Sequence, residues 1–211
     1  MIKHNASIFI VDDDESVRSG LKRLLKSAGY GTETFANAAD FLEYYNNFEG
    51  PACLILDIKM PGKSGLDLQE ELVPGEYSIP IVFITGHGDI PTSVKAMKKG
   101  AVDFLSKPFE DKDLLDAINA ALEKDSKMRT LVTERKNIQQ QFELLTPREY
   151  EIMTFIISGI LNKQIAAALN ITEKTVKVHR ARVFAKVGIV SVAELVRLAE
   201  KVGIRPASVS N

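Results

Sequence analysis

The sequence of 211 residues predicts an α/β fold, in which a five-stranded, doubly wound parallel sheet is joined by a long helix to a small all-α domain of four helices. Short apolar runs alternate with helix-like segments five times in the first half, as in a parallel sheet with helices on both faces. No glycine or proline occurs between Asp111 and Leu145, so one long helix fits that stretch. Threonine-capped helical segments follow and indicate a compact helical domain.

The strands are expected where apolar runs end in polar or turn-forming residues. They cover residues 7–11, 32–35, 53–57, 80–85 and 102–105. Four apolar residues in a row, 53–56, are typical of a strand buried on both faces, and Asp57 follows them. Pro61-Gly62 then turns the chain. This third strand is therefore expected at the centre of the sheet.

Charge divides the chain into two modules. Residues 1–123 carry 12 lysine and arginine residues against 20 aspartate and glutamate, whereas residues 146–211 carry 10 against 5. A basic module is a candidate for binding nucleic acid. We expect domains at residues 1–123 and 144–211, joined by a helical linker at 124–143.

Composition favours a protein of the cytoplasm that does not enter membranes. Hydrophobic residues make up 45% and charged residues 26% of the chain, as in ordinary globular proteins. No apolar run is long enough to span a bilayer, and residues 1–5 do not begin a signal peptide. The single cysteine, Cys53, fits a reducing compartment and a core position better than a nucleophilic role.

Polar side chains stand at the carboxyl ends of four expected strands. They are Asp12, Asp13, Asp57, Thr85 and Lys107. Because these ends share one edge of a parallel sheet, we expect the side chains to converge. Crowded carboxylates repel one another unless a cation lies among them, and Mg²⁺ suits carboxylates, a backbone carbonyl and waters. Lysine and threonine supply the charge and hydroxyl that a transferred phosphoryl group needs.

Four motifs give these residues a resemblance to the receiver domain of two-component response regulators. They are Asp12-Asp13, Asp57-x-x-Met60-Pro61-Gly62, Thr85-Gly86 and Lys107-Pro108-Phe109, in order over roughly residues 5–122. The resemblance implies a flavodoxin-like fold. It also implies that Asp57 accepts a phosphoryl group from a histidine of a sensor kinase.

The resemblance further implies a magnesium site around this aspartate. Asp13, Asp57 and the backbone carbonyl of Lys59 would bind Mg²⁺ directly, and Asp12 would contribute largely through water. The remaining alternative is an Mg²⁺-dependent phosphatase that uses Asp57 as its nucleophile. Such enzymes usually carry a second aspartate two positions later, where this chain has Lys59.

A switch is also implied by the resemblance. Lys107 would contact the phosphoryl oxygens, Thr85 would move inward to bond them, and Phe104 would follow at the switch-aromatic position. Phosphorylation adds charge and strong acceptors, so such a step can bias a two-state element. The chain would then be no enzyme, but a phosphoacceptor that assists its own phosphorylation and dephosphorylation.

The long helix carries an imperfect three-four apolar spacing. The positions are Leu114, Ala121, Met128, Leu131, Arg135, Ile138, Phe142 and Leu145. The stretch is one helix, or two helices with a joint near 124–127. Its stripe fits a coiled-coil dimer, packing on the chain's own domains, or a partly flexible charged linker.

The C-terminal segment has the pattern of a helix-turn-helix. Thr146-Pro147-Arg148-Glu149 is a helix start, helices are expected over residues 162–169 and from Thr172, and a fourth over 192–202. Two short helices joined by a tight turn place the second helix in the major groove of DNA, although another small helical bundle shows similar turns.

Three stretches resemble the LuxR-type DNA-binding domain. They are residues 145–149, 162–166 and 175–179. Receiver plus this domain is the layout of the NarL/FixJ family, and the run 85–91 is most similar to its FixJ-like branch. The resemblance implies a phosphorylation-activated transcription regulator that pairs as a homodimer, through helix 192–202 on DNA. Its partners would be a sensor histidine kinase, promoter DNA and RNA polymerase. An adaptor binding protein or RNA through its helical end is the other alternative.

The resemblance also assigns DNA contacts. Lys177 and Val178 would face base edges, and Ala181, often polar in the family, leaves room for a thymine-methyl contact. Contacts to the DNA backbone are assigned to Lys163, Thr175, Arg180, Arg182 and Lys186.

Overall fold

The computed structural model describes residues 6–46, 48–72, 78–86 and 90–207. The chain forms two compact units, residues 1–130 and 131–211. The expected domain bounds, 1–123 and 144–211 with a linker at 124–143, stay a prediction beside this division of the chain. In the described ranges, no helix combines the length and apolar character needed to cross a membrane.

The first unit alternates strands and helices, as predicted. Its strands are β1 Ser7–Val11, β2 Gly31–Phe35, β3 Ala52–Asp57, β4 Ile81–Thr85 and β5 Asp103–Ser106. Its helices are α1 Glu15–Ser27, α2 Ala38–Tyr45, α3 Gly65–Leu72, α4 Ile90–Lys98 and the first part of α5 Asp111–Glu143. Asp14 caps α1 by accepting from the backbone N–H groups of Ser16 and Val17.

The sheet places β3 at its centre. The five described strands run parallel in the order β2-β1-β3-β4-β5, with Val11 opposite Leu56 and Asp57 opposite Ile84. All six residues of β3 are buried. The chain adds β2 on one side of β1 and then β3, β4 and β5 on the other side. The strand order therefore reverses between β1 and β3, and folds of this kind form a ligand crevice at the carboxyl ends of those two strands. Asp57 ends its strand at this crevice.

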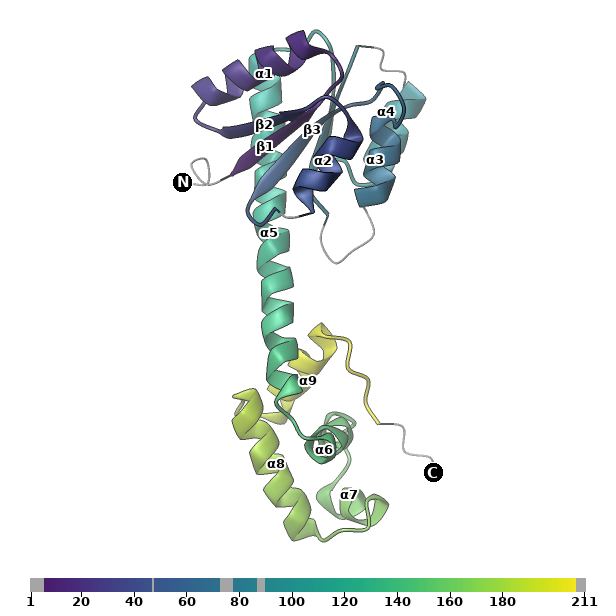
Figure 1. Ribbon diagram of the computed structural model, residues 1–211. Helices are drawn as coiled ribbons and strands as arrows, with labels where there is room; N and C mark the ends of the chain where they lie inside the picture. Colours follow the sequence, from purple (N-terminus) through teal and green to yellow (C-terminus); the bar gives the residue numbers. More distant parts are fainter. Residues whose placement is uncertain (1–5, 47, 73–77, 87–89, 208–211) are drawn as a thin grey trace. The chain divides into compact units, whose positions relative to one another are not determined.

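Alternate residues of each strand face opposite layers of helices (Figure 1). One face packs on α1 and α5, and its central residues are Ile8, Ile10, Cys53, Ile55, Val82 and Ile84. The other face packs on α2, α3 and α4, and its central residues are Phe9, Val11, Leu54, Leu56, Ile81 and Phe83. The prediction of a doubly wound sheet is thus confirmed. Successive side chains of a strand point to opposite faces of the sheet, so each strand contributes to both helix layers.

The apolar stripe of α5 is used mainly by the chain's own cores. Leu114 and Ala121 are buried in the first unit. Three later members, Ile138, Phe142 and Leu145, are buried in the second. Met128 and Leu131 between them are exposed. The helix is continuous over Asp111–Glu143, so the stripe reflects packing on both units rather than requiring a coiled coil.

The second unit contains the end of α5 and the helices α6 Pro147–Ile157, α7 Asn162–Ala168, α8 Glu173–Val187 and α9 Val192–Lys201. Their starts follow from the sequence, because Thr146, Thr172 and Ser191 each accept a backbone N–H from the first turn of their helix. Apolar side chains of α6, α7, α8 and α9 share one core.

An ion pair between a buried glutamate and a partly exposed lysine joins the start of α6 to the end of α8. Glu149 is 3% exposed, and its Oε2 accepts from the Thr146 N–H at 2.9 Å and from Lys186 Nζ at 2.6 Å. Lys186 also donates to the carbonyl of Leu144 at 3.0 Å. The Lys186 hydrogen bond, followed by the backbone hydrogen bond from Thr146, lowers the pKa of Glu149 to about 2.

We expect this pair to make the second unit sensitive to acid. Because the pKa of Glu149 lies below its ordinary value of 4.5, its stabilising effect is complete above pH 4.5 and is lost as the pH falls toward 2. The protection factors of α6 amides in the full chain, which remove the pH dependence of the intrinsic exchange rate, should fall over this window in the wild type. Glu149→Gln should start with lower protection and respond less to acid.

Glu151→Gln is the matched control, because Glu151 forms an exposed pair with Arg148 on the same helix. An unchanged acid response in Glu149→Gln would contradict the assignment.

Candidate functional site

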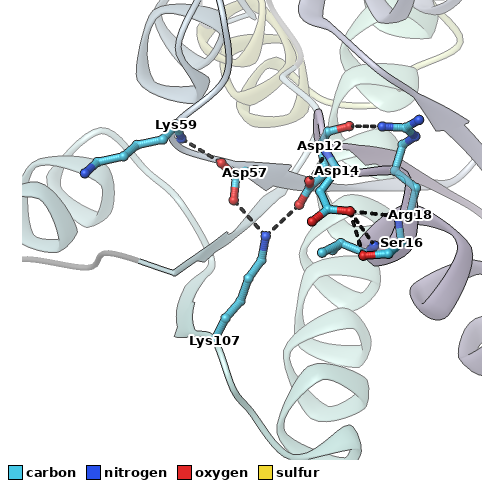
Figure 2. A network of polar contacts seen from close by, with 8 residues as sticks. Asp12, Asp14, Ser16, Arg18, Asp57, Lys59 and Lys107 are labelled. Carbon is cyan, nitrogen blue, oxygen red and sulfur yellow. Dashed lines mark hydrogen bonds and ion pairs between the residues drawn. The ribbon is translucent and has the colours of Figure 1, made fainter.

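Three side chains predicted from the sequence meet at the carboxyl edge of the sheet. Lys107 Nζ lies 2.7 Å from Asp12 Oδ2 and 2.9 Å from Asp57 Oδ1 (Figure 2). Asp12 follows β1, Asp57 ends β3 and Lys107 follows β5, so the parallel sheet alone brings them together. Both carboxylates are buried, with Asp12 1% and Asp57 5% exposed.

The electrostatics of this site leave it short of positive charge. Burial raises the pKa of Asp57, although the hydrogen bond from Lys107 opposes this. Burial also disfavours the charged lysine, yet the hydrogen bonds to Asp12 and Asp57 raise the pKa of Lys107 above its ordinary value. Two buried carboxylates therefore share one ammonium, and this oxygen-rich, anionic set suits a hard divalent cation.

The backbone orients the Asp57 carboxylate. Its Oδ2 accepts the N–H of Lys59 at 2.7 Å, while Oδ1 accepts from Lys107. The main-chain N–H of Lys59 thus fixes the plane of the carboxylate, and the lysine side chain projects elsewhere (Figure 2). The predicted role of Lys59, its carbonyl as a metal ligand, stays a prediction.

The loop after β1 is held by its own hydrogen bonds. Asp12 Oδ1 accepts the Asp14 N–H at 2.9 Å, and Arg18 Nη1 donates to the Asp12 carbonyl at 2.7 Å (Figure 2). Asp14 Oδ1 accepts from Ser16 Oγ, a hydrogen bond that lowers the pKa of Asp14. Asp13, between the two anchored aspartates, is exposed. Arg18 is absent from the predicted residues, because its contact with a backbone carbonyl leaves no motif.

The magnesium site is not assembled from side chains alone. Among the residues that the structure describes, no three His, Cys, Asp or Glu side chains form a group that could hold a metal ion. Asp12 and Asp57 are joined through Lys107, and Asp13, the residue after Asp12, is exposed. The predicted ligand set needs the Lys59 carbonyl and waters besides these carboxylates.

The two predicted switch residues lie beside the site. Thr85 ends β4, is 1% exposed, and its carbonyl accepts the Lys107 N–H at 2.7 Å. Phe104 of β5 is half-buried against the core on the α2–α3–α4 side and lies opposite Phe83. Of the run 85–91, residues 87–89 lie outside the described residues.

The turn after β3 admits only glycine at one point. The N–H of Gly65 donates to the Ile58 carbonyl at 3.0 Å, and a Cβ on Gly65 would lie 2.2 Å from the carbonyl oxygen of Asp57. The start of α3 therefore packs directly on the backbone of the strand end. Gly65 is a further residue that the motifs did not single out.

In the second unit, α7 and α8 form the predicted helix-turn-helix. Asn170 adopts a left-handed conformation in the turn, with φ of 51°. Arg148 Nη2 of α6 donates to the Leu169 carbonyl at 3.0 Å and so supports the turn from outside the motif. Val176, Val183 and Val187 bury one face of α8 in the core.

The predicted DNA-contacting residues fall into two groups. Exposed residues are Lys163 on α7 and Lys177, Val178, Ala181 and Arg182 on α8, the last four at helical spacing on one face. The other group makes contacts within the unit. Thr175 bonds the capping Thr172, Arg180 lies over the Phe184 ring at 5.4 Å, and Lys186 is held by Glu149. The first group is exposed and the second is partly engaged within the unit, and the DNA contacts of both groups stay predictions.

Fold and site together define a receiver domain joined to a helix-turn-helix module. The family description "Response regulator receiver domain" matches residues 8–119, and "Bacterial regulatory proteins, luxR family" matches residues 143–199. The chain belongs to the response regulators that combine a receiver domain with a LuxR-family DNA-binding domain.

Similar proteins share this layout over nearly their full length. The chain is 47% identical to Nodulation protein W of Bradyrhizobium diazoefficiens over 199 residues, which cover 94% of this chain and 87% of that protein. It is 39% identical to the transcriptional regulatory protein FixJ of the same organism over 197 residues, 93% and 96% of the two chains.

Two solved structures extend the comparison to three dimensions. The response regulator StyR has a TM-score of 0.80 at 49% identity, with 93% of this chain and 99% of that chain covered. Full-length FixJ of B. japonicum has a TM-score of 0.56 at 38% identity, with 96% and 98% covered. The prediction of a FixJ-like response regulator is confirmed.

We expect Gly65→Ala to distort the site. The added Cβ would strike the Asp57 carbonyl, so the free energy of unfolding should fall by about 1–3 kcal/mol, as for other overpacked positions. Urea unfolding of the full chain measures this.

The matched control is Gly20→Ala within α1, where a Cβ meets no atom within 4 Å. It should stabilise by about 0.5–1 kcal/mol because alanine favours helix. Equal effects of the two substitutions would contradict the geometry.

Proposed function

We propose that Asp57 is the phosphoacceptor of this response regulator. The observation that carries the proposal is its placement: a buried carboxylate at the end of the central strand, held by Lys107 at 2.9 Å and by the Lys59 N–H at 2.7 Å. The donor would be a phosphohistidine of a sensor kinase, or a small acyl phosphate in vitro.

Each residue has a role in the transfer. A carboxylate oxygen of Asp57 attacks phosphorus, the O–P bond forms, and the P–N bond to the donor histidine breaks, with its electron pair leaving on nitrogen. Lys107 stabilises charge on the phosphoryl oxygens. Asp12, Asp13, Asp57 and the Lys59 carbonyl would hold Mg²⁺, which neutralises charge between the acidic residues and the phosphoryl group when bound.

The response follows from the new charge on Asp57. The phosphoryl group adds strong hydrogen-bond acceptors beside the end of β4, where Thr85 ends its strand. Thr85 would bond one of these oxygens and Phe104 would move inward after it. This shift would favour a homodimer, through a receiver face, α5 or α9, and hence binding to promoter DNA and recruitment of RNA polymerase in the cytoplasm.

DNA would be read by the exposed face of α8. Lys177 and Val178 would face base edges with Ala181 against a thymine methyl group, while Arg182 and Lys163 of α7 contact phosphates. Three further residues would support this face through contacts within the unit, namely Thr175, Arg180 and Lys186. Their predicted contacts to the DNA phosphate backbone would be secondary to this supporting role.

We expect Asp57→Asn to abolish phosphorylation. With acetyl phosphate and Mg²⁺, the wild type should gain one phosphoryl group by intact-mass spectrometry, because Asp57 is the carboxylate that Lys107 and the Lys59 N–H present at the strand end. The exposed Asp116→Asn, on α5, is the control and should label normally. Labelling of Asp57→Asn would refute the assignment, and multiple turnover on phosphate esters would indicate a phosphatase.

Two substitutions on α8 should weaken DNA binding in different ways. Lys177→Ala should cost about 1–3 kcal/mol on a selected duplex and relax its sequence preference, because base contacts specify. Arg182→Ala should weaken all duplexes alike and reduce the salt dependence by about one unit of slope, because phosphate contacts release counterions. Gel shifts at several salt concentrations measure both, and identical behaviour of the two variants would be evidence against this division.

A further inference from the structure

One buried carboxylate has no part in the phosphoacceptor site. Asp125 lies on α5 beyond the last residues of the receiver match, and its relative exposure is 0%. An aspartate on a helix that leaves a domain is ordinarily solvated. Its burial therefore needs a reason.

The contacts of Asp125 join the helix to the central strand. Oδ2 accepts from Arg129 Nε at 2.8 Å and from the backbone N–H of Ala52 at 3.4 Å. Ala52 is the first residue of β3, and the pairing of β3 with β4 begins only at Leu54. The side chain thus contacts an amide that precedes the β3–β4 ladder. The same strand carries Asp57 at its other end.

This carboxylate is held at a cost. Its Oδ1 is buried without a hydrogen-bond partner among the described residues. Burial raises the pKa of Asp125, with Arg129 acting against this. A packed apolar residue would hold the helix without that cost, but would not fix it in one rotation and register. A directional hydrogen bond to a strand amide does so.

The preceding residue contacts a second element. Lys124 Nζ donates to the carbonyl of Gly100, which follows α4, at 2.9 Å. Two successive residues of α5 therefore touch the start of β3 and the turn that follows α4. Two residues earlier, about half a turn around the helix, the pair Glu123–Lys127 has the same i,i+4 spacing but is exposed, with side chains 65% and 71% exposed.

We propose that Asp125 is a positioning residue for the response to phosphorylation. It clamps α5 to the amino end of β3, so that the helix turns beyond Leu122 move with the phosphoacceptor unit and carry its state along the chain toward the DNA-binding unit. The proposal rests on the proposed phosphorylation of Asp57.

The clamp is tested first by hydrogen exchange of the full chain. In Asp125→Ala, amides 124–130 should exchange roughly tenfold faster, the change expected when one buried charged hydrogen bond is lost. In the control Glu123→Ala they should stay at the wild-type rate. Because Cys53 follows Ala52 and is the single, buried cysteine, its rate of thiol labelling should rise in Asp125→Ala as well.

The coupling is tested on DNA selected from a random-sequence duplex pool by the phosphorylated wild type. Asp125→Ala should accept a phosphoryl group from acetyl phosphate to the wild-type extent, yet lose most of the gain in affinity that phosphorylation gives. Glu123→Ala should keep that gain. A full gain in Asp125→Ala with faster exchange would overturn the coupling, and unchanged exchange would overturn the clamp.

Two further results keep the test decisive. If Asp125→Ala does not fold, Asp125→Asn replaces it, since the amide keeps the shape but lacks the charge that pairs with Arg129. Wild-type exchange and gain in Asp125→Asn would then overturn the proposal. If the wild type itself does not take up a phosphoryl group, the phosphoacceptor assignment is refuted instead. The clamp is then tested by the hydrogen-exchange experiment alone.

Discussion

The sharing of one ammonium group by two buried carboxylates is the interaction on which the first unit's chemistry depends. Lys107 pairs with both Asp12 and Asp57, which lie 95 and 50 residues away along the chain, so the site exists only when β1, β3 and β5 are in place in the sheet. Because one positive charge serves two negative ones, the site suits a further cation, and under the proposed function that cation would accompany the anionic phosphoryl group. The Nζ atom of Lys107 thus holds three strand ends together and also sets the charge of the site.

The sequence was sufficient for whatever depends on periodicity and strand ends. The unbroken apolar run 53–56 predicted a central strand buried on both faces, and parallel topology then required Asp12, Asp57 and Lys107 to meet. Helix starts at Thr146 and Thr172 followed from local capping chemistry. In each case the deciding interactions lie within a few residues or follow from the layout of the sheet.

Side chains that bond distant backbone groups could not be predicted in this way. Arg18 holds the Asp12 carbonyl, Arg148 the Leu169 carbonyl and Asp125 the Ala52 N–H. Backbone partners exist at every residue, so no pair of residue types marks such a contact. The pairing of Lys186 with Glu149, 37 residues away, likewise left no local signal in the sequence, and the DNA contact that the resemblance assigns to Lys186 stays a prediction.

The burial of Ile138 and Phe142 in the core of the second unit has a practical consequence. The last turns of α5 supply apolar side chains to that core and so belong to its folding unit. A fragment that begins at residue 144 would lack these side chains and would expose the apolar core residues that they cover. Exposed apolar surface of this kind promotes self-association. A soluble, autonomous fragment should retain the helix from before Ile138.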